Sequence, residues 1–157
     1  MAKQHTYSLT IQWTGNSGNG TNGYHSYERS HSILIDGKEE IKASSDPAFL
    51  GDKTKPNPEE LLLASISSCH MLWFLHLCSD KGIIVTDYID QPIGTMVIAK
   101  DGGGKFTDVI LKPLVTAKDN PSPEILNDLH TQANKMCFIA NSVNFPVRHR
   151  GKVVGSM

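Results

Sequence analysis

The first third of the chain alternates between apolar and polar side chains. Residues 7–13 place an apolar side chain at every second position, which is the period of a strand with one buried face. A loop rich in glycine and asparagine, residues 15–23, follows. We expect a second strand over 24–35 and, after a tight Asp-Gly turn, a third strand over 39–43. Residues 1–45 are therefore expected to form the N-terminal strands.

The middle of the chain changes to a long apolar run with a clear helix start. Asn57 suits the N-cap, a proline occupies the first helical position, and Glu60 is placed to reach back to the cap as in a capping box. We expect a helix over 57–81, ended by Gly82. Apolar side chains surround nearly all of its circumference, which indicates a helix buried on all sides. Burial inside an oligomer meets that requirement.

The rest of the chain repeats the order of strands followed by helix. Residues 83–116 have strand patterns, 122–144 favour helical pieces, and 147–154 suit a final strand. The resulting order, βββ-α-βββ-α-β, predicts an α+β protein without regular βαβ alternation. The length of 157 residues is typical of a single domain, 1–157.

Composition and charge narrow the class of protein. Apolar residues make up 39% and charged residues 20%, which is typical of a globular chain. The chain has fifteen Lys and Arg residues and sixteen Asp and Glu residues, so it carries no excess of positive charge that would bind a nucleic acid. The N-terminus has no apolar core of signal-peptide type, and the apolar stretch 71–77 is too short to cross a bilayer. We expect a cytoplasmic protein without a membrane segment.

Two glycine-rich segments resemble nucleotide-binding motifs only superficially. Residues 18–23 fit G-x-G-x-x-G, but a strand pattern follows them where a helix is needed under the pyrophosphate. Residues 102–105 lack the spacing and the Ser or Thr of a phosphate-binding loop. Both are predicted to be ordinary loops, and we expect no cofactor.

A metal site is also disfavoured on the long helix. Cys69, His70, His76 and Cys78 are candidate ligands by residue type. Adjacent helical residues point about 100° apart, so the four side chains do not converge on one ion. Structural zinc sites prefer cysteine pairs at other spacings. We expect no metal site.

Three cysteines are too few for a disulfide framework, so in a reducing compartment we expect any cysteine chemistry to be catalytic or metal-binding and not structural. Cys69 lies mid-helix, and the alternative is that it packs as a small apolar residue. Cys78 lies nine residues further along the same helix and is expected to pack. Cys137 is distant enough in sequence for the fold to bring it beside Cys69. A thiol in an apolar pocket stays protonated unless a cation lies nearby.

Two segments together resemble the OsmC/Ohr family, the osmotically induced and organic hydroperoxide resistance proteins. The first is Asn-Pro-Glu-Glu-Leu-Leu at 57–62, followed by Ser-Ser-Cys at 67–69 and the continuing apolar helix. The second is Cys-Phe-Ile-Ala-Asn-Ser-Val at 137–143. The resemblance covers 57–80 and 137–147, and it fits the element order of the whole chain.

The resemblance implies a cysteine-based peroxidase that serves in defence against oxidative stress. By family analogy, Cys69 is the peroxidatic cysteine and becomes a sulfenic acid, and Cys137 then forms a disulfide with it. The implied partners are an organic hydroperoxide as substrate and an external dithiol as reductant, a role that lipoyl groups fill in the family. The implied fold is an intertwined homodimer with long central helices packed against antiparallel sheets.

The family also uses a glutamate paired with an arginine, and Glu59 matches the glutamate. The alternative is that Glu59 is only a first-turn acid favoured by the helix dipole. Ten residues of straight helix put Glu59 about 15 Å from Cys69 along the axis. Glu59 is therefore expected either to lie beyond a kink or to serve the cysteine of the other subunit.

The arginine is where this chain departs from the family pattern. The loop before the Asn-Pro-Glu motif has no arginine, and the chain holds only Arg29, Arg148 and Arg150. We take Arg29 as the candidate, because a strand over 24–35 would place it on one face with other polar side chains; a solvated strand face is the alternative. His70 is a second candidate cation, with a packed or hydrogen-bonded helix histidine as the alternative.

The apolar residues near Cys69 indicate the class of substrate, and two alternative functions stay open. Leu72, Trp73, Phe138 and Phe145 are expected to line an apolar pocket around the thiol, which would favour an organic hydroperoxide. One rival is a catalytically weak or inactive member of the fold that binds a small ligand. Another is acyl or persulfide chemistry on Cys69, for which His76 is poorly placed as a base.

Overall fold

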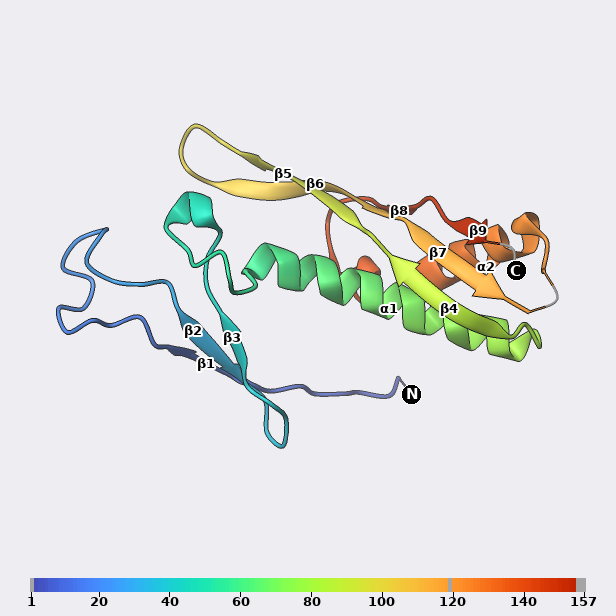
Figure 1. Cartoon of the computed structure of the whole chain (residues 1–157), viewed down its shortest axis with the longest axis horizontal. Coiled ribbons are helices and arrows are strands. Elements are labelled where there is room, and N and C mark those ends of the chain that lie inside the picture. The colour runs from blue at the N-terminus through green and yellow to red at the C-terminus, as the bar shows by residue number, and fades with distance from the viewer. Residues whose placement is uncertain (1, 119, 155–157) are drawn as a thin grey trace. The chain divides into compact units, whose positions relative to one another are not determined.

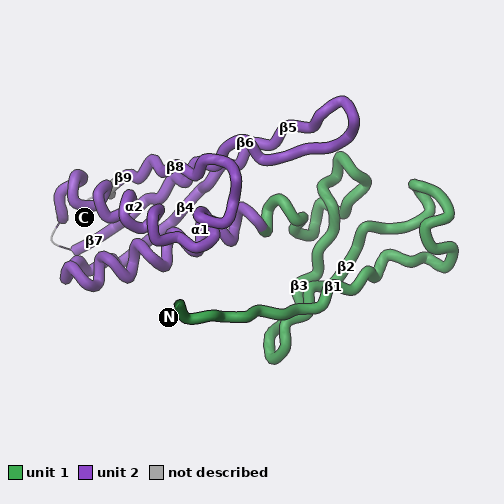
Figure 2. Tube along the Cα trace, turned by 180° about the vertical axis from the view of Figure 1, so that it is seen from behind, with its two compact units in different colours: residues 1–61 green, residues 62–157 purple. Residues whose placement is uncertain are grey.

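The computed structural model describes residues 2–118 and 120–154. They form two compact units, residues 1–61 and residues 62–157, which Figure 2 colours separately. The single domain expected from the length stays a prediction. Each unit is described by itself below.

Unit 1 contains a three-stranded antiparallel sheet in the order β1-β2-β3 (Figure 1). The strands are β1 (Thr10–Trp13), β2 (His31–Leu34) and β3 (Ile41–Ala43), with a short 3-10 helix at Pro47–Phe49. Thr10 pairs with Leu34 and Trp13 with His31. All four residues of β1 are exposed, so the buried face expected from the alternation is not present within this chain. All three strands are shorter than expected.

The expected strand over 24–35 is wrong for its first half. The backbone turns at Gly23, where the amide of Ser26 donates to the Gly23 carbonyl. The guanidinium of Arg29 then donates to the carbonyls of Tyr24 and Tyr27, which occupies acceptors that a strand ladder would use. Residues 24–30 are therefore a loop, and they do not present one strand face.

Unit 2 holds the rest of the strands in two three-stranded sheets, β4-β7-β9 and β5-β6-β8. Within each sheet the first pair is antiparallel and the second, β7·β9 or β6·β8, is parallel. The sheets are therefore mixed, where antiparallel sheets were expected. The strands are β4 (Val85–Asp90), β5 (Ile93–Ile98), β6 (Gly104–Leu111), β7 (Pro113–Ala117), β8 (Val147–His149) and β9 (Lys152–Val154).

Two strands that the sequence presents as continuous are divided. Within the region 83–116, where strand patterns were expected, the chain breaks between β6 and β7 at Lys112, whose backbone amide donates to the Asp90 carboxylate at 2.7 Å instead of continuing a ladder. The final segment, 147–154, breaks before Gly151. A Cβ at Gly151 would lie 2.9 Å from Cδ2 of His130, so the chain passes the histidine ring where only glycine fits. Each division lets one segment serve both sheets.

The long helix α1 runs from Pro58 to Asp80, close to the expected 57–81. Its capping box forms: the Glu60 amide donates to Asn57 Oδ1 at 2.9 Å, and the Asn57 amide donates to Glu60 Oε2 at 3.1 Å. One stripe of α1 is buried, namely Ile66, His70, Phe74 and Cys78. The all-round burial expected for this helix is therefore not reached within one chain.

By length and composition, α1 is apolar enough to cross a membrane. We expected no segment long enough to cross a bilayer, but that expectation considered only the apolar stretch 71–77. Whether a helix is long and apolar enough to span a membrane must be judged on the whole helix. Core helices of soluble proteins pass the same test, and α1 carries the buried stripe of such a helix.

Two apolar clusters pack against α1 in unit 2. Towards its C-terminal end, Phe74 and Cys78 meet residues of β7 and of the second helix, α2 (Pro123–Met136). Nearer its start, Ile66 packs against Val109 and Leu111 of β6. α2 begins at the N-cap Ser122 and ends at Cys137, which has an extended backbone, and a short 3-10 helix follows at Ala140–Ser142.

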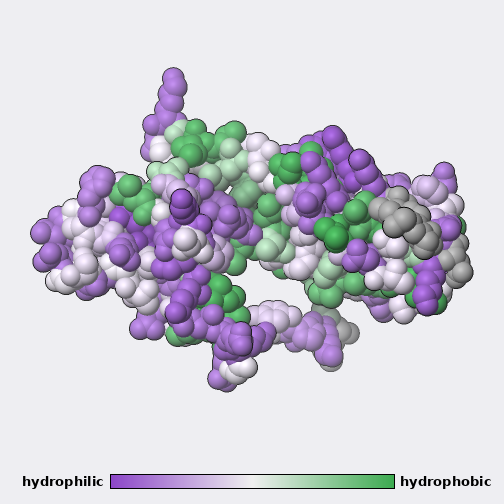
Figure 3. Space-filling view, in the orientation of Figure 1, coloured by the Kyte–Doolittle hydropathy of each residue, from purple (hydrophilic) through white to green (hydrophobic). Residues whose placement is uncertain are grey.

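Apolar side chains also remain at the surface of unit 2. Leu72 on α1 is 63% exposed, and Ile93, Val97 and Ile98 on the β5–β6 hairpin are each about half exposed or more. Figure 3 shows hydrophobic residues at the surface of this hairpin. Exposed apolar patches of this kind are typical of surfaces that a partner covers.

Candidate active site

The fold brings together two cysteines that lie far apart in the sequence. Cys69 sits midway along α1, and Cys137 follows directly after α2. The Cys137 sulfur lies 4.0 Å from the carbonyl oxygen of Ile66, three residues before Cys69 on α1, and the Cys69 thiol is near enough to affect the pKa of Cys137. Both cysteines are free thiols; Cys69 is partly exposed and Cys137 is fully buried.

The surroundings of Cys137 keep its thiol protonated at rest. Burial, aided by the contact with the Cys69 thiol, raises the pKa of Cys137 to about 11. The backbone amide of Ala140 donates to the Cys137 sulfur at 3.4 Å and partly offsets this rise. The same amide would stabilise negative charge on the sulfur whenever the thiol ionises.

An apolar cavity of about 200 Å³ opens beside Cys69 on the same face of α1. Leu72, Trp73 and His76 line it, three, four and seven residues after the cysteine. The ring of Phe138 meets Trp73 edge to face, with centroids 5.6 Å apart. Three of the four expected pocket residues are thus close to one another.

Phe145 is the exception among the expected pocket residues. It packs against Phe106, with ring centroids 5.5 Å apart, and belongs to the apolar cluster around Ile66. Its role in this structure is core packing. The sequence does not indicate that Phe138 meets Trp73 whereas Phe145 turns into the core.

Glu59 lies in the first turn of α1, and its Oε2 atom is buried without a hydrogen-bond partner among the described residues. Helix α1 continues without a break from Pro58 to Asp80, so no kink shortens the separation of about 15 Å from Cys69. A buried carboxylate oxygen without a partner is costly, and it is typical of an incomplete site.

Arg29 is engaged within its own loop. Its guanidinium carbon lies 4.5 Å from the centre of the Tyr24 ring and 4.1 Å from that of Tyr27. Arg148 forms an ion pair with Asp108 at 2.5 Å. The expectation that Arg29 serves Cys69 stays a prediction.

The sequence matches the family model for the OsmC-like protein over residues 51–150. This chain belongs to the OsmC-like family. No protein with a curated description matches it. Both cysteines and the whole of α1 lie within the matched region.

Solved structures of OsmC-like proteins share the fold. An OsmC-like protein of unknown function from Vibrio cholerae is 30% identical over 95% of this chain and 100% of its own, with a TM-score of 0.86. An organic hydroperoxide resistance protein from Elizabethkingia anophelis is 17% identical over 98% and 100% of the two chains, with a TM-score of 0.69. The organic hydroperoxide resistance protein OhrB of Bacillus subtilis is 19% identical over 94% and 98%, with a TM-score of 0.60.

Of the remaining candidates on α1 of this OsmC-like chain, Cys78 packs in the core and His76 lies at the surface. Burial raises the pKa of Cys78 to about 11, so this thiol stays protonated. His76 is exposed and pairs with Asp80 at 3.5 Å. Over residues 2–118 and 120–154, no group of three His, Cys, Asp or Glu side chains is arranged to hold a metal ion.

His70 is not the second cation that the sequence allowed. It is fully buried, and burial lowers its pKa to about 4, so the imidazole is neutral near pH 7. It bonds instead to His130 of α2, and both rings lie near His149 of β8. Sequence reasoning missed this cluster, because its members come from three elements and form no motif.

Proposed function

We propose that this OsmC-like chain is a thiol-dependent peroxidase that reduces organic hydroperoxides in the cytoplasm, in defence against oxidative stress. One observation carries the proposal, namely the proximity of the Cys69 and Cys137 thiols. A partly exposed cysteine near a buried one suits a two-cysteine redox cycle.

In the first step, the Cys69 thiolate attacks the outer oxygen of the hydroperoxide. A sulfur–oxygen bond forms, the O–O bond breaks, and the alkoxide takes up a proton and leaves as an alcohol. The sulfur is oxidised by two electrons to sulfenic acid. The peroxide is reduced by the same two electrons, so the step is balanced.

In the second step, the Cys137 sulfur attacks the sulfur of Cys69 after losing its proton. A disulfide forms, and the hydroxyl group of the sulfenic acid leaves as water with that proton. An external dithiol, for which a lipoyl group is the expected class, then restores both thiols by exchange and is itself oxidised to a disulfide. The proximity of Cys69 and Cys137 supports this step.

The cavity beside Cys69 supports a preference for organic hydroperoxides. Its walls of Leu72 and Trp73 offer an apolar surface to an alkyl or aryl group, and burial is worth about 0.8 kcal/mol per methylene. We expect a higher kcat/KM for cumene hydroperoxide than for hydrogen peroxide. A preference for hydrogen peroxide would contradict this assignment.

We propose further that the active unit is an intertwined homodimer. Within the described part of the chain, Oε2 of Glu59 has no hydrogen-bond partner, and the unbroken helix keeps Glu59 far along the axis from Cys69 of its own chain. In the proposed dimer, Glu59 of one protomer serves Cys69 of the other, and an arginine, for which Arg29 is the candidate, pairs with it. The dimer is then required for activity and not only for stability.

Separate replacement of the cysteines tests the cycle. With cumene hydroperoxide and dihydrolipoamide, Cys69→Ser should consume no peroxide. With cumene hydroperoxide alone, because a dithiol would itself condense with a sulfenic acid, Cys137→Ser should consume about one equivalent and leave a sulfenic acid that dimedone traps. Cys78→Ala is the control, because Cys78 packs in the core away from the thiol pair, and it should retain turnover. Intact thiols in the wild type after exposure to peroxide, as seen by mass spectrometry, would refute the proposal.

One observation favours a second candidate function. The guanidinium of Arg29 is already engaged with Tyr24 and Tyr27. If no cation reaches Cys69, the chain would be a catalytically weak member of the fold that binds a small ligand. Slow peroxide consumption, below that of free cysteine at equal concentration, would favour this alternative.

A further inference from the structure

The core of unit 2 contains a hydrogen-bonded pair of histidines apart from the thiol pair. Nε2 of His70 lies 3.0 Å from Nδ1 of His130, and the two rings are nearly parallel. Phe74 stacks on the other face of His130, with centroids 3.9 Å apart. His130 is 3% exposed and His70 is fully buried. This packing fixes the orientation of both imidazoles.

The hydrogen bonds determine which nitrogen carries each proton. Burial lowers the pKa of His70 to about 4 and that of His130 to about 3, so each neutral ring has one N–H. Nδ1 of His70 is buried without a partner among the described residues. An unpartnered buried N–H is rarer than an unpartnered acceptor. We therefore assign the His70 proton to Nε2, which donates to Nδ1 of His130, and the His130 proton to Nε2.

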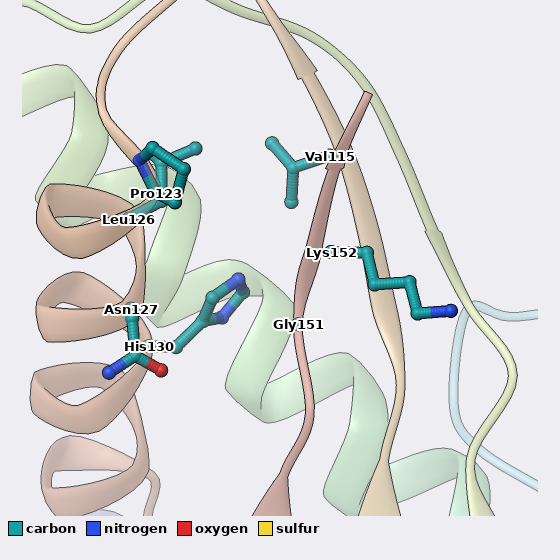
Figure 4. A pocket seen from close by; sticks show the side chains of 7 residues that line it. All are labelled: Val115, Pro123, Leu126, Asn127, His130, Gly151 and Lys152. Carbon is teal, nitrogen blue, oxygen red and sulfur yellow. The ribbon is translucent and has the colours of Figure 1, made fainter. Parts of the chain in front are cut away.

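Nε2 of His130 has no protein hydrogen-bond partner in the part of the chain that the structure describes, and His130 lines a cavity of about 290 Å³. Figure 4 shows its imidazole pointing from α2 into the space between Leu126, Val115 and the strand at Gly151. A Cβ at Gly151 would lie 3.0 Å from Nε2. The missing side chain at 151 therefore keeps this edge of the ring open.

The walls of the cavity indicate the chemistry of a ligand. Three apolar residues, Val115, Pro123 and Leu126, form one side, and no carboxylate is among the described residues that line it. Lys152 is the charged residue among the described residues of the lining, and Figure 4 shows its ammonium group directed away from His130. The N–H donor inside an otherwise apolar lining favours an anion with an apolar body, because an ionised acceptor forms the stronger hydrogen bond.

We propose that this cavity binds a small carboxylate with an apolar body, whose carboxylate accepts the Nε2–H of His130. The apolar body lies against Leu126, Val115 and Pro123. Cys69 and Cys137 are not among the lining residues, so the site is separate from the thiol pair and goes beyond the proposed peroxidase function.

Nuclear magnetic resonance of the imidazoles tests the donor. Long-range ¹H–¹⁵N spectra distinguish the two neutral forms of histidine. At pH 7, His130 should carry its proton on Nε2, and its Nε2 signal should shift on addition of benzoate. A proton on Nδ1 of His130 would overturn the assignment and the proposal with it.

Titration with benzoate tests the binding, and benzamide is the probe of the same shape without charge. Benzoate should bind saturably and about tenfold more tightly than benzamide, because an ionised acceptor forms the stronger hydrogen bond. Asn127→Phe, at an exposed lining position, should weaken benzoate about tenfold by filling the mouth of the cavity. Gln132→Phe is the matched control, because Gln132 is exposed on the same helix outside the lining, and it should leave affinity unchanged.

Three results would overturn the proposal. The first is no saturable binding of benzoate, and the second is an affinity for benzamide equal to that for benzoate. The third is an affinity for benzoate that is the same in the Asn127→Phe variant as in the wild type. Both substitutions are at the surface of α2, so both variants are expected to fold. Peroxide consumption by the same samples reports on Cys69 independently. Failure of this proposal is therefore distinguishable from failure of the peroxidase proposal.

Discussion

Two buried histidines make the stability of the fold depend on pH. His70 and His130 have pKa values of about 4 and about 3 in the folded chain, against 6.5 for an ordinary histidine. Below pH 6.5 the unfolded chain binds protons at these rings and the folded chain does not. The contribution of these two histidines to the free energy of unfolding is therefore fully present above pH 6.5, and it is lost as the pH drops towards 4.

We expect the free energy of unfolding to fall by up to about 1.4 kcal/mol per pH unit for each histidine in this range. Urea unfolding between pH 7.5 and pH 4.5 measures the slope. His70→Gln should reduce the slope by about one proton, whereas His76→Gln, at an exposed position, should leave it unchanged. Equal slopes in the wild type and His70→Gln would contradict the prediction.

Single residues were predictable where a local motif identifies them. Cys69 and Cys137 each belong to a recognisable segment, and the fold places their thiols together. Phe145 was not assigned correctly and His130 was not identified, because the direction of a side chain depends on neighbours from distant parts of the chain. For the same reason, the loop contacts of Arg29 were not foreseen.

At the scale of elements, the start of α1 depends on the reciprocal bonds between Asn57 and Glu60. Asn57→Ala removes the acceptor for the Glu60 amide, and we expect a loss of about 1 kcal/mol in the free energy of unfolding. Asn57→Asp keeps an acceptor and should retain most of the stability. Urea unfolding at pH 7.5 measures both, and an Ala variant as stable as the wild type would show that the cap contributes nothing.

Helices were predicted more closely than strands, and the reason is physical. Caps at Asn57 and Ser122 are local in sequence, so the starts of both helices could be located. Strand ends depend on partners elsewhere in the chain. The loop over 24–30 and the breaks at Lys112 and Gly151 follow from contacts with Arg29, Asp90 and His130, which no periodicity reveals.

At the scale of the whole molecule, exposed apolar residues on the β5–β6 hairpin predict a homodimer. Sedimentation velocity at micromolar concentration should show the dimer. Val97→Lys should weaken it about tenfold or more, because a buried charge without a partner is costly. Thr86→Lys, exposed on β4, is the control. A wild-type monomer would contradict the dimer and the role proposed for Glu59.

The α+β class and the family were predictable because the order of the elements and two motif segments suffice for them. The topology of the sheets was not, because parallel pairing of β6 with β8 and of β7 with β9 joins residues far apart in sequence. A sequence pattern identifies a strand but not its neighbour.

The segment carrying β8 and β9 supplies the third strand of one sheet and then of the other. During synthesis, the β5-β6-β8 sheet therefore stays incomplete until residue 149 has left the ribosome, and the β4-β7-β9 sheet until residue 154 has left it. Before these points, β6 and β7 each present an open edge in the nascent chain. Truncation before Val147 would leave two incomplete sheets at once, a product that chaperones and proteases would encounter instead of a folded protein.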